Sequence, residues 1–263
     1  MDLGLRDKVA VVTGGSSGIG LATARLMLAE GASVAICGRD EARLEAAKAS
    51  LLKEAPSERL LAIRCDVLKE AEVAEFARNV EIWTGRCDIL VNNAGQARMS
   101  NFAQTTDEAW RQELELKFFS QIYPVRAFKP LLDNSNAAAI LAVNALLAYQ
   151  PEPYMVCTSA ARAGVQNLVK SLAREFAPYI RVNAILLGLV DSGQWQRRFA
   201  AREDQSQSRE SWYADLARSR HIPLERLGHP EEVASAIAFL CSPAASFITG
   251  AQLEISGGAS RYM

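Results

Sequence analysis

The chain has 263 residues, of which 49% are hydrophobic and 22% charged, values that are ordinary for a globular protein. Its 29 Lys and Arg residues against 30 Asp and Glu residues leave a net charge of −1, which excludes a general electrostatic attraction to nucleic acid or to an anionic membrane. The two histidines, His221 and His229, are too few for a multi-histidine metal centre, and we expect no metal site.

The cysteines and the N-terminal residues indicate in which cellular compartment the protein is expected. Five cysteines occur without a CxxC pair, and their odd number argues against a disulfide framework or a cysteine zinc site. The first residues are charged and lack the apolar core of a signal peptide. No apolar run reaches the roughly 18 residues that a membrane span needs. We therefore expect a reduced, cytoplasmic protein that contacts neither membrane nor nucleic acid.

Short apolar runs alternate with longer helical patterns along the chain. Strands are predicted at Val9–Val12, Ser33–Cys37, Leu60–Cys65, Ile89–Val91, Ala138–Ala145, Ile180–Leu186 and Gln252–Ile255. Helices are predicted at Ile19–Ala29, Asp40–Lys53, Glu70–Trp83, Asp107–Phe128, Thr158–Phe176 and Glu231–Leu240, and Asp40 is placed to cap the second of them.

This alternation predicts an α/β fold, a single Rossmann-type doubly wound parallel sheet with helices on both faces. No linker rich in Pro, Gly or Ser divides the chain, so one domain over residues 1–263 fits better than two. The main irregular insertion covers residues 191–222, and we expect it to form a lid or substrate loop.

A glycine-rich loop joins the first predicted strand to the first helix. Its glycines allow a sharp turn and a close backbone approach to a pyrophosphate, and the helix N-terminus adds N–H donors and a partial positive charge. A flexible turn is the simpler interpretation, but the strand before and the helix after favour dinucleotide binding. The predicted cofactor residues are Gly14, Ser16, Ser17, Gly18, Ile19 and Gly20.

The tip of the second strand indicates which dinucleotide binds. An acidic side chain is expected there for NAD, and Gly38 holds that place. Arg39 follows, and its guanidinium can meet a 2′-phosphate bidentately, although it could also be a solvated surface arginine. We therefore expect NADP, with NAD less favoured.

The ordered motifs of the chain resemble those of the classical short-chain dehydrogenase/reductase family over nearly its whole length. The matching segments are Thr13–Gly20 (T-G-x-x-x-G-x-G), Asp66-Val67, Asn92–Gly95 (N-N-A-G), Leu187–Ser192, Arg226–Ala234, Thr249-Gly250 and Gly257-Gly258. The Leu187–Ser192 loop departs from the family's P-G-x-x-x-T form by leucine for proline and serine for threonine.

The resemblance implies one Rossmann domain and a homotetramer or homodimer that assembles through the helices Asp107–Phe128 and Thr158–Phe176. It also adds cofactor-binding residues to those of the glycine-rich loop and Arg39. These are Asp66, Val67, Asn93, Ala94, Gly95, Arg162 and Gly188.

The family carries out its redox chemistry with an Asn, Ser, Tyr and Lys tetrad, and all four matching positions differ here. Lys117 stands for the asparagine, Ala145 for the serine, Thr158 for the tyrosine and Arg162 for the lysine. Because the interval from Ala145 to Thr158 equals the family spacing and residues 155–161 contain no tyrosine, a register slip does not restore the site.

These substitutions change the available chemistry. A threonine hydroxyl is a far poorer proton donor than a phenol, and Ala145 offers a carbonyl oxygen nothing. Arg162 keeps its charge and can bind ribose hydroxyls. Lys117 is either a replacement general acid or clamp for an anionic substrate, or a surface lysine that snorkels beside a dead site. Tyr154 reaches the site only if its helix begins early.

The sequence therefore supports an oxidoreductase of this family that binds NADP(H), with weak or altered activity on carbonyls or alcohols. A non-redox dinucleotide-binding pseudoenzyme or scaffold, and an enzyme of another reaction type in the same pocket, stay open, because the fold alone does not choose among them. No residue names the substrate.

Overall fold

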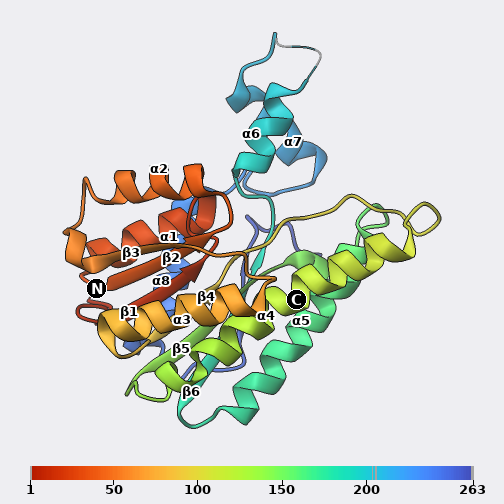
Figure 1. Ribbon diagram of the computed structural model, residues 1–263. Coiled ribbons are helices and arrows are strands. Elements are labelled where there is room, and N and C mark those ends of the chain that lie inside the picture. Colours follow the sequence, from red (N-terminus) through yellow and green to blue (C-terminus); the bar gives the residue numbers. More distant parts are fainter. Residues whose placement is uncertain (1, 203, 205, 262–263) are drawn as a thin grey trace.

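The computed structural model describes residues 2–202, 204 and 206–261, and it is built around one parallel sheet of seven strands (Figure 1). The strand order is β3-β2-β1-β4-β5-β6-β7. The strands are β1 (Val9–Thr13), β2 (Ser33–Gly38), β3 (Leu60–Arg64), β4 (Ile89–Asn92), β5 (Ala138–Ala145), β6 (Ile180–Leu187) and β7 (Gln252–Ile255). The α/β doubly wound fold predicted from the sequence is confirmed.

Helices cover both faces of the sheet because its strands are apolar on both sides. In β1, Ala10 and Val12 face one core while Val9 and Val11 face the other. The first core is closed by α1 (Gly18–Ala29), α2 (Glu41–Leu51) and α8 (Pro230–Cys241), and the second by α3 (Glu70–Thr84), α4 (Asp107–Leu132) and α5 (Val156–Glu175).

The order of the strands reverses beside β1. The chain moves outward from β1 to β2 and β3, then returns to place β4 on the other side of β1. The connections diverge between β1 and β4 and leave a crevice at their carboxyl ends, which is where open α/β sheets bind ligands. The glycine-rich turn after β1 and the Asn92–Gly95 segment after β4 both lie at this point.

Each predicted helix differs from its observed limits by at least one residue, and the larger differences are in α2, α4 and α5; α2 ends at Leu51, two residues before the predicted end. Helix α4 continues to Leu132 through Pro124 and Pro130, four residues past the predicted end. Burial of Phe128, Leu131 and Leu132 in the second core holds this last turn in place. Helix α5 begins at Val156, two residues earlier than predicted.

The insertion over residues 191–222 forms two short helices, α6 (Gly193–Ala200) and α7 (Arg209–Ser219), which project from the body (Figure 1). Positions 203 and 205 lie outside the described residues. Aromatic rings hold the pair together: Trp212 lies 6.2 Å from Trp195 and 5.8 Å from Phe199, between ring centroids. The Arg202 guanidinium stacks 4.0 Å from the Phe199 ring.

Within the described residues, three short 3-10 helices complete the connections, at Ser57–Arg59, Leu146–Ala148 and Pro243–Ala245. Among the residues that the structure describes, no helix has both the length and the apolar character needed to cross a membrane.

Candidate functional site

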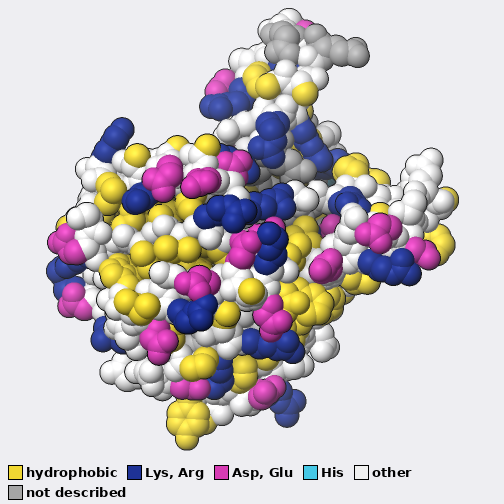
Figure 2. All heavy atoms as spheres, viewed as in Figure 1, with side chains coloured by type: hydrophobic (Ala, Val, Ile, Leu, Met, Phe, Trp, Pro, Cys, Tyr) yellow, Lys and Arg dark blue, Asp and Glu magenta, His cyan; other side chains and the backbone are white. Residues whose placement is uncertain are grey.

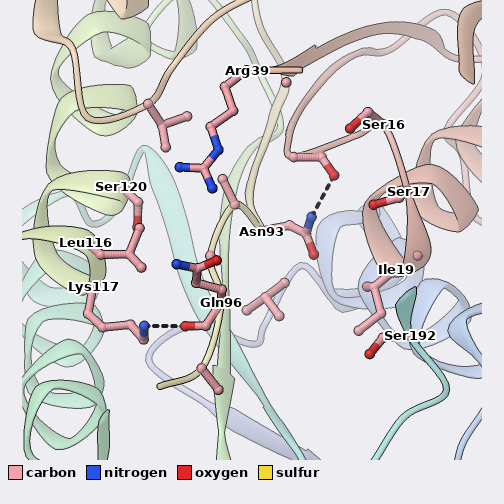
Figure 3. Close-up of a pocket in the computed structure, with 18 of the residues that line it drawn as sticks. Ser16, Ser17, Ile19, Arg39, Asn93, Gln96, Leu116, Lys117, Ser120 and Ser192 are labelled. Carbon is pink, nitrogen blue, oxygen red and sulfur yellow. Dashed lines mark hydrogen bonds between the residues drawn. The ribbon is translucent and has the colours of Figure 1, made fainter. Parts of the chain in front are cut away.

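A cavity of about 490 Å³ opens at the carboxyl ends of the central strands. Its walls come from the turn after β1, the tip of β2, the segments after β3 and β4, and helices α4, α5 and α6. Figure 3 shows its two ends: Arg39 and Ser16 lie at one, and Lys117 and Gln96 at the other. The length of this cavity suits a long ligand that touches all of these elements.

The turn after β1 is fixed by hydrogen bonds to the segment after β4. The Asn93 side-chain amide donates to the carbonyl oxygens of Thr13 at 3.0 Å and Gly14 at 3.2 Å. The Thr13 hydroxyl in turn accepts from the backbone N–H groups of Asn93 and Ala94. Helix α1 then begins at Gly18 and directs its free N–H groups at the cavity, as a phosphate requires.

Gly20 and Gly188 act behind the wall rather than on the cavity, which neither of them lines. A Cβ on Gly20 would stand 2.4 Å from the carbonyl oxygen of Gly14, and one on Gly188 would stand 2.8 Å from the Cα of Ser256. Close backbone packing therefore explains these two glycines. The other predicted cofactor residues all line the cavity, namely Gly14, Ser16, Ser17, Gly18, Ile19, Arg39, Asp66, Val67, Asn93, Ala94, Gly95 and Arg162.

The tip of β2 forms a corner of the cavity. Gly38 ends the strand, where an acidic side chain is expected for NAD, and the cationic Arg39 follows it. Arg39 is exposed, directs its guanidinium into the cavity (Figure 3), and has no ion-pair partner in the described part of the chain. A Cβ on Gly38 would come within 3.0 Å of the Ser16 hydroxyl oxygen. Asp40 is occupied as the predicted cap of α2, where it accepts from Arg43 N–H at 3.0 Å. The corner is shaped for an anion.

Positive charge continues along the rim of the cavity. Arg43 and Arg197, the latter from α6, line it together with Arg39. Figure 2 shows Lys and Arg side chains gathered at the hollow between the body and the α6–α7 projection. A ligand with several phosphates would be attracted to this rim.

Lys117 lies at the opposite end of the cavity and is only 5% exposed, so the surface-lysine interpretation is wrong. Its ammonium donates to the Gln96 carbonyl oxygen at 2.5 Å (Figure 3) and pairs with the Glu113 carboxylate at 2.7 Å. Burial and the neighbouring Arg162 charge lower the pKa of Lys117 to about 8, against the opposing effect of Glu113. The group can therefore gain and lose a proton near neutral pH.

Glu113 is part of the site but was not predicted from the sequence. It stands one helical turn before Lys117 on α4, and it is 2% exposed. A signal was present, because acidic and basic residues four apart on a helix form a pair. The spacing alone did not show that the pair is buried.

Thr158 lies behind the wall of the cavity. Its side chain is fully buried, and its hydroxyl donates to Glu113 at 2.5 Å and accepts from Arg98 N–H at 3.4 Å. Neither Thr158 nor Ala145 lines the cavity. Of the four tetrad-equivalent positions, the fold brings only Lys117 and Arg162 to the cavity surface.

Arg162 is held by a reciprocal pair of hydrogen bonds with Asn144 on β5. Its guanidinium donates to Asn144 Oδ1, and the Asn144 amide donates to the Arg162 carbonyl, both at 3.1 Å. Burial lowers the pKa of Arg162 to about 10, which still leaves it protonated at neutral pH. Its Nε is buried without a hydrogen-bond partner among the described residues, while the residue itself lines the cavity.

Tyr154, the other candidate named from the sequence, and the remaining tyrosine and histidine side chains near these elements have other positions or partners. The Tyr154 hydroxyl contacts Arg220, and its ring borders a separate surface pocket. The Tyr149 hydroxyl donates to Glu254 at 2.7 Å. His229 is the N-cap residue of α8, and His221 occupies a turn with a φ of 54°. Among the described residues, no group of three or more His, Cys, Asp or Glu side chains is arranged to hold a metal ion.

The fold and the cavity define a Rossmann-type α/β protein, and comparison with known proteins identifies its family. Residues 14–260 match the family model described as enoyl-(acyl carrier protein) reductase. A curated relative, cis-4-hydroxycyclohexanecarboxylate dehydrogenase of Sinomonas cyclohexanicum, is 36% identical, with 96% of each chain covered. The chain belongs to the short-chain dehydrogenase/reductase family.

Solved structures with the same fold include a short-chain oxidoreductase of Pseudomonas aeruginosa PAO1 that contains an atypical catalytic center. Its apo form is 59% identical, with a TM-score of 0.95 and coverage of 97% of this chain and 98% of that one. Its NADPH-bound form is 58% identical, with a TM-score of 0.92 and coverage of 98% and 100%. L-Sorbose reductase of Gluconobacter frateurii, complexed with NADPH and L-sorbose, is 31% identical, with a TM-score of 0.94 and full coverage of both chains.

Proposed function

We propose that this protein is an NADPH-dependent oxidoreductase of carbonyl or alcohol substrates in which Lys117 replaces the family's tyrosine as proton donor. One observation carries the proposal: a buried lysine ammonium with a lowered pKa faces the cofactor cavity beside Arg162. The altered tetrad makes the activity different in rate or substrate range from that of the usual family site.

Two observations support NADPH as the cofactor. The corner formed by Gly38, Ser16 and Arg39 leaves room for a 2′-phosphate and supplies a guanidinium to pair with it. At the other end, Arg162 lines the cavity, and its guanidinium suits a ribose hydroxyl. The NADPH-bound relatives from Pseudomonas aeruginosa and Gluconobacter frateurii support the same assignment.

The chain's own residues would then manage the proton. When bound, NADPH supplies the hydride that forms the new C–H bond at the substrate carbon. Lys117 has three N–H donors, of which Gln96 and Glu113 take two, so one is left for the cavity. During reduction the Lys117 ammonium gives its proton to the carbonyl oxygen and becomes a neutral amine. A pKa of about 8 suits this exchange, because a general acid works best when its pKa is near the working pH.

Binding and turnover test the proposal separately. Isothermal titration calorimetry with NADPH and NADH should show saturable binding that is tighter for NADPH. Loss of NADPH absorbance, followed with a panel of carbonyls that includes 4-oxocyclohexanecarboxylate, L-sorbose and acetoacetyl-CoA, should reveal reduction of at least one class. Tight NADPH binding without turnover of any carbonyl or alcohol would favour the non-redox binding protein instead.

Assembly and location are part of the same proposal. A homodimer or homotetramer that pairs through α4 and α5 is supported by the exposed apolar side chain of Leu114 on α4. A reducing, cytoplasmic setting is supported by five buried free cysteines. Light scattering after size-exclusion chromatography tests the assembly, and a monomer at micromolar concentration would contradict it.

A further inference from the structure

We propose that Glu113 is the positioning residue for Lys117, which it holds at the end of the cavity and keeps protonated. The part of this inference that concerns proton transfer rests on the proposed function. The ionisation of Lys117, however, can be measured without any turnover.

The geometry limits Glu113 to an indirect role. Its carboxylate is 2% exposed and does not line the cavity, so it touches neither cofactor nor substrate there. Its Oε1 lies 2.7 Å from Lys117 Nζ, across one turn of α4. The Gln96 carbonyl fixes the ammonium from another side. Together they leave one N–H of Lys117 to act on a bound molecule.

The charges around Lys117 explain why a carboxylate is needed. Arg162 approaches from α5 and Arg98 from the segment before α4, and both cations favour the neutral amine, as does burial. Glu113 is the opposing charge on α4, and its ion pair and hydrogen bond favour the ammonium. Without Glu113, a buried lysine beside two arginines would have a lower pKa and would lose its proton at a lower pH than Lys117 does now.

The same carboxylate also accounts for the position of Thr158. Its Oε1 accepts the Thr158 hydroxyl at 2.5 Å, which turns that hydroxyl away from the cavity. Glu113 therefore holds Lys117 at the cavity surface and Thr158 in the interior, so that of these two side chains Lys117 contacts the ligand.

The experiment compares Glu113→Gln with Glu115→Gln in the full-length protein. Both variants remove one carboxylate from α4, but Glu115 is exposed and does not line the cavity. Protein labelled with carbon-13 at the lysine Cε position is titrated by NMR, and the Lys117→Met variant identifies the Lys117 signal. We expect the Lys117 midpoint to fall by about one pH unit or more in Glu113→Gln, since a close opposite charge shifts a pKa by roughly 1–3 units. We expect no shift in Glu115→Gln.

The pH profile of carbonyl reduction provides the second readout. The pH above which activity declines should move down in Glu113→Gln by the same amount as the NMR midpoint, which a merely structural role would not produce.

If Glu113→Gln does not fold, Glu113→Asp takes its place, and its longer gap to Lys117 should lower the midpoint by a smaller amount. A Lys117 midpoint equal to that of the wild type in the tested variant would overturn the inference. Absence of turnover in the wild type would refute the proposed function alone, because the NMR midpoint still decides the role of Glu113.

Discussion

At one end of the cavity, the turn after β1 and Asn93 form the proposed phosphate site from residues that the family pattern names. At the other end, Lys117 and Arg162 stand where that pattern names asparagine and lysine. The first end works through backbone N–H groups and close packing, so few substitutions are compatible with it: a Cβ on Gly20 would meet a carbonyl oxygen at 2.4 Å. The second end works through side-chain charge, and different side chains can supply charge if their environment compensates for it. Glu113 is that compensation.

The largest expected effect is on kcat, and it should come from a substitution at the Lys117 end of the cavity that leaves cofactor binding at the other end intact. Lys117→Met should lower kcat for carbonyl reduction by about 100-fold or more, the scale of a lost general acid, and leave NADPH affinity within a few fold. Steady-state kinetics and calorimetry measure the two quantities. Lys129→Met, on the same helix, is the control. Equal kcat in Lys117→Met and wild type, with the same pH profile, would remove Lys117 from the reaction.

A substitution at the opposite end should reverse this pattern. Arg39→Ala should weaken NADPH binding by about tenfold or more, because a charge-assisted hydrogen bond to a phosphate contributes roughly 1.5–3 kcal/mol. NADH binding should change little, and kcat at saturating NADPH should be retained. Calorimetry with both cofactors is the measurement. An equal loss for NADH and NADPH would contradict the 2′-phosphate assignment.

The pH dependence sharpens the comparison, since Lys117, the proposed proton donor, has a pKa of about 8. In the proposed mechanism reduction needs the Lys117 ammonium, so the rate should fall as the pH rises through about 8, approaching tenfold per pH unit above it. Alcohol oxidation needs the neutral amine and should rise through the same pH. Arg162, with a pKa of about 10, stays charged across this range. Stopped-flow rates at saturating cofactor would test this, and a reduction rate that stays level from pH 7 to 9.5 would contradict it.

The sequence predicted the two ends unequally, for physical reasons. Strand and helix patterns located all seven strands to within a residue or two, because apolar runs and turn residues act locally. The predicted cofactor residues came from motifs in a fixed chain order, and all of them except Gly20 and Gly188 line the cavity. The burial of the Lys117–Glu113 pair and the inward direction of the Thr158 hydroxyl depend on how α4 packs against its neighbours, which residue spacing does not show.

Thr158 gives the smallest expected effect on activity and the sharpest check on which replaced residue matters. Thr158→Val keeps the shape but removes the donor to a buried carboxylate, so we expect unfolding to require about 1–3 kcal/mol less free energy. The hydroxyl faces Glu113 and not the cavity, so kcat/KM should change by no more than about threefold, under about 1 kcal/mol of transition-state stabilisation. Urea unfolding and steady-state kinetics on the same preparation separate the two. A loss of kcat comparable to that of Lys117→Met, with stability unchanged, would show that the hydroxyl turns toward the ligand during the reaction and that Glu113 does not hold it in the interior.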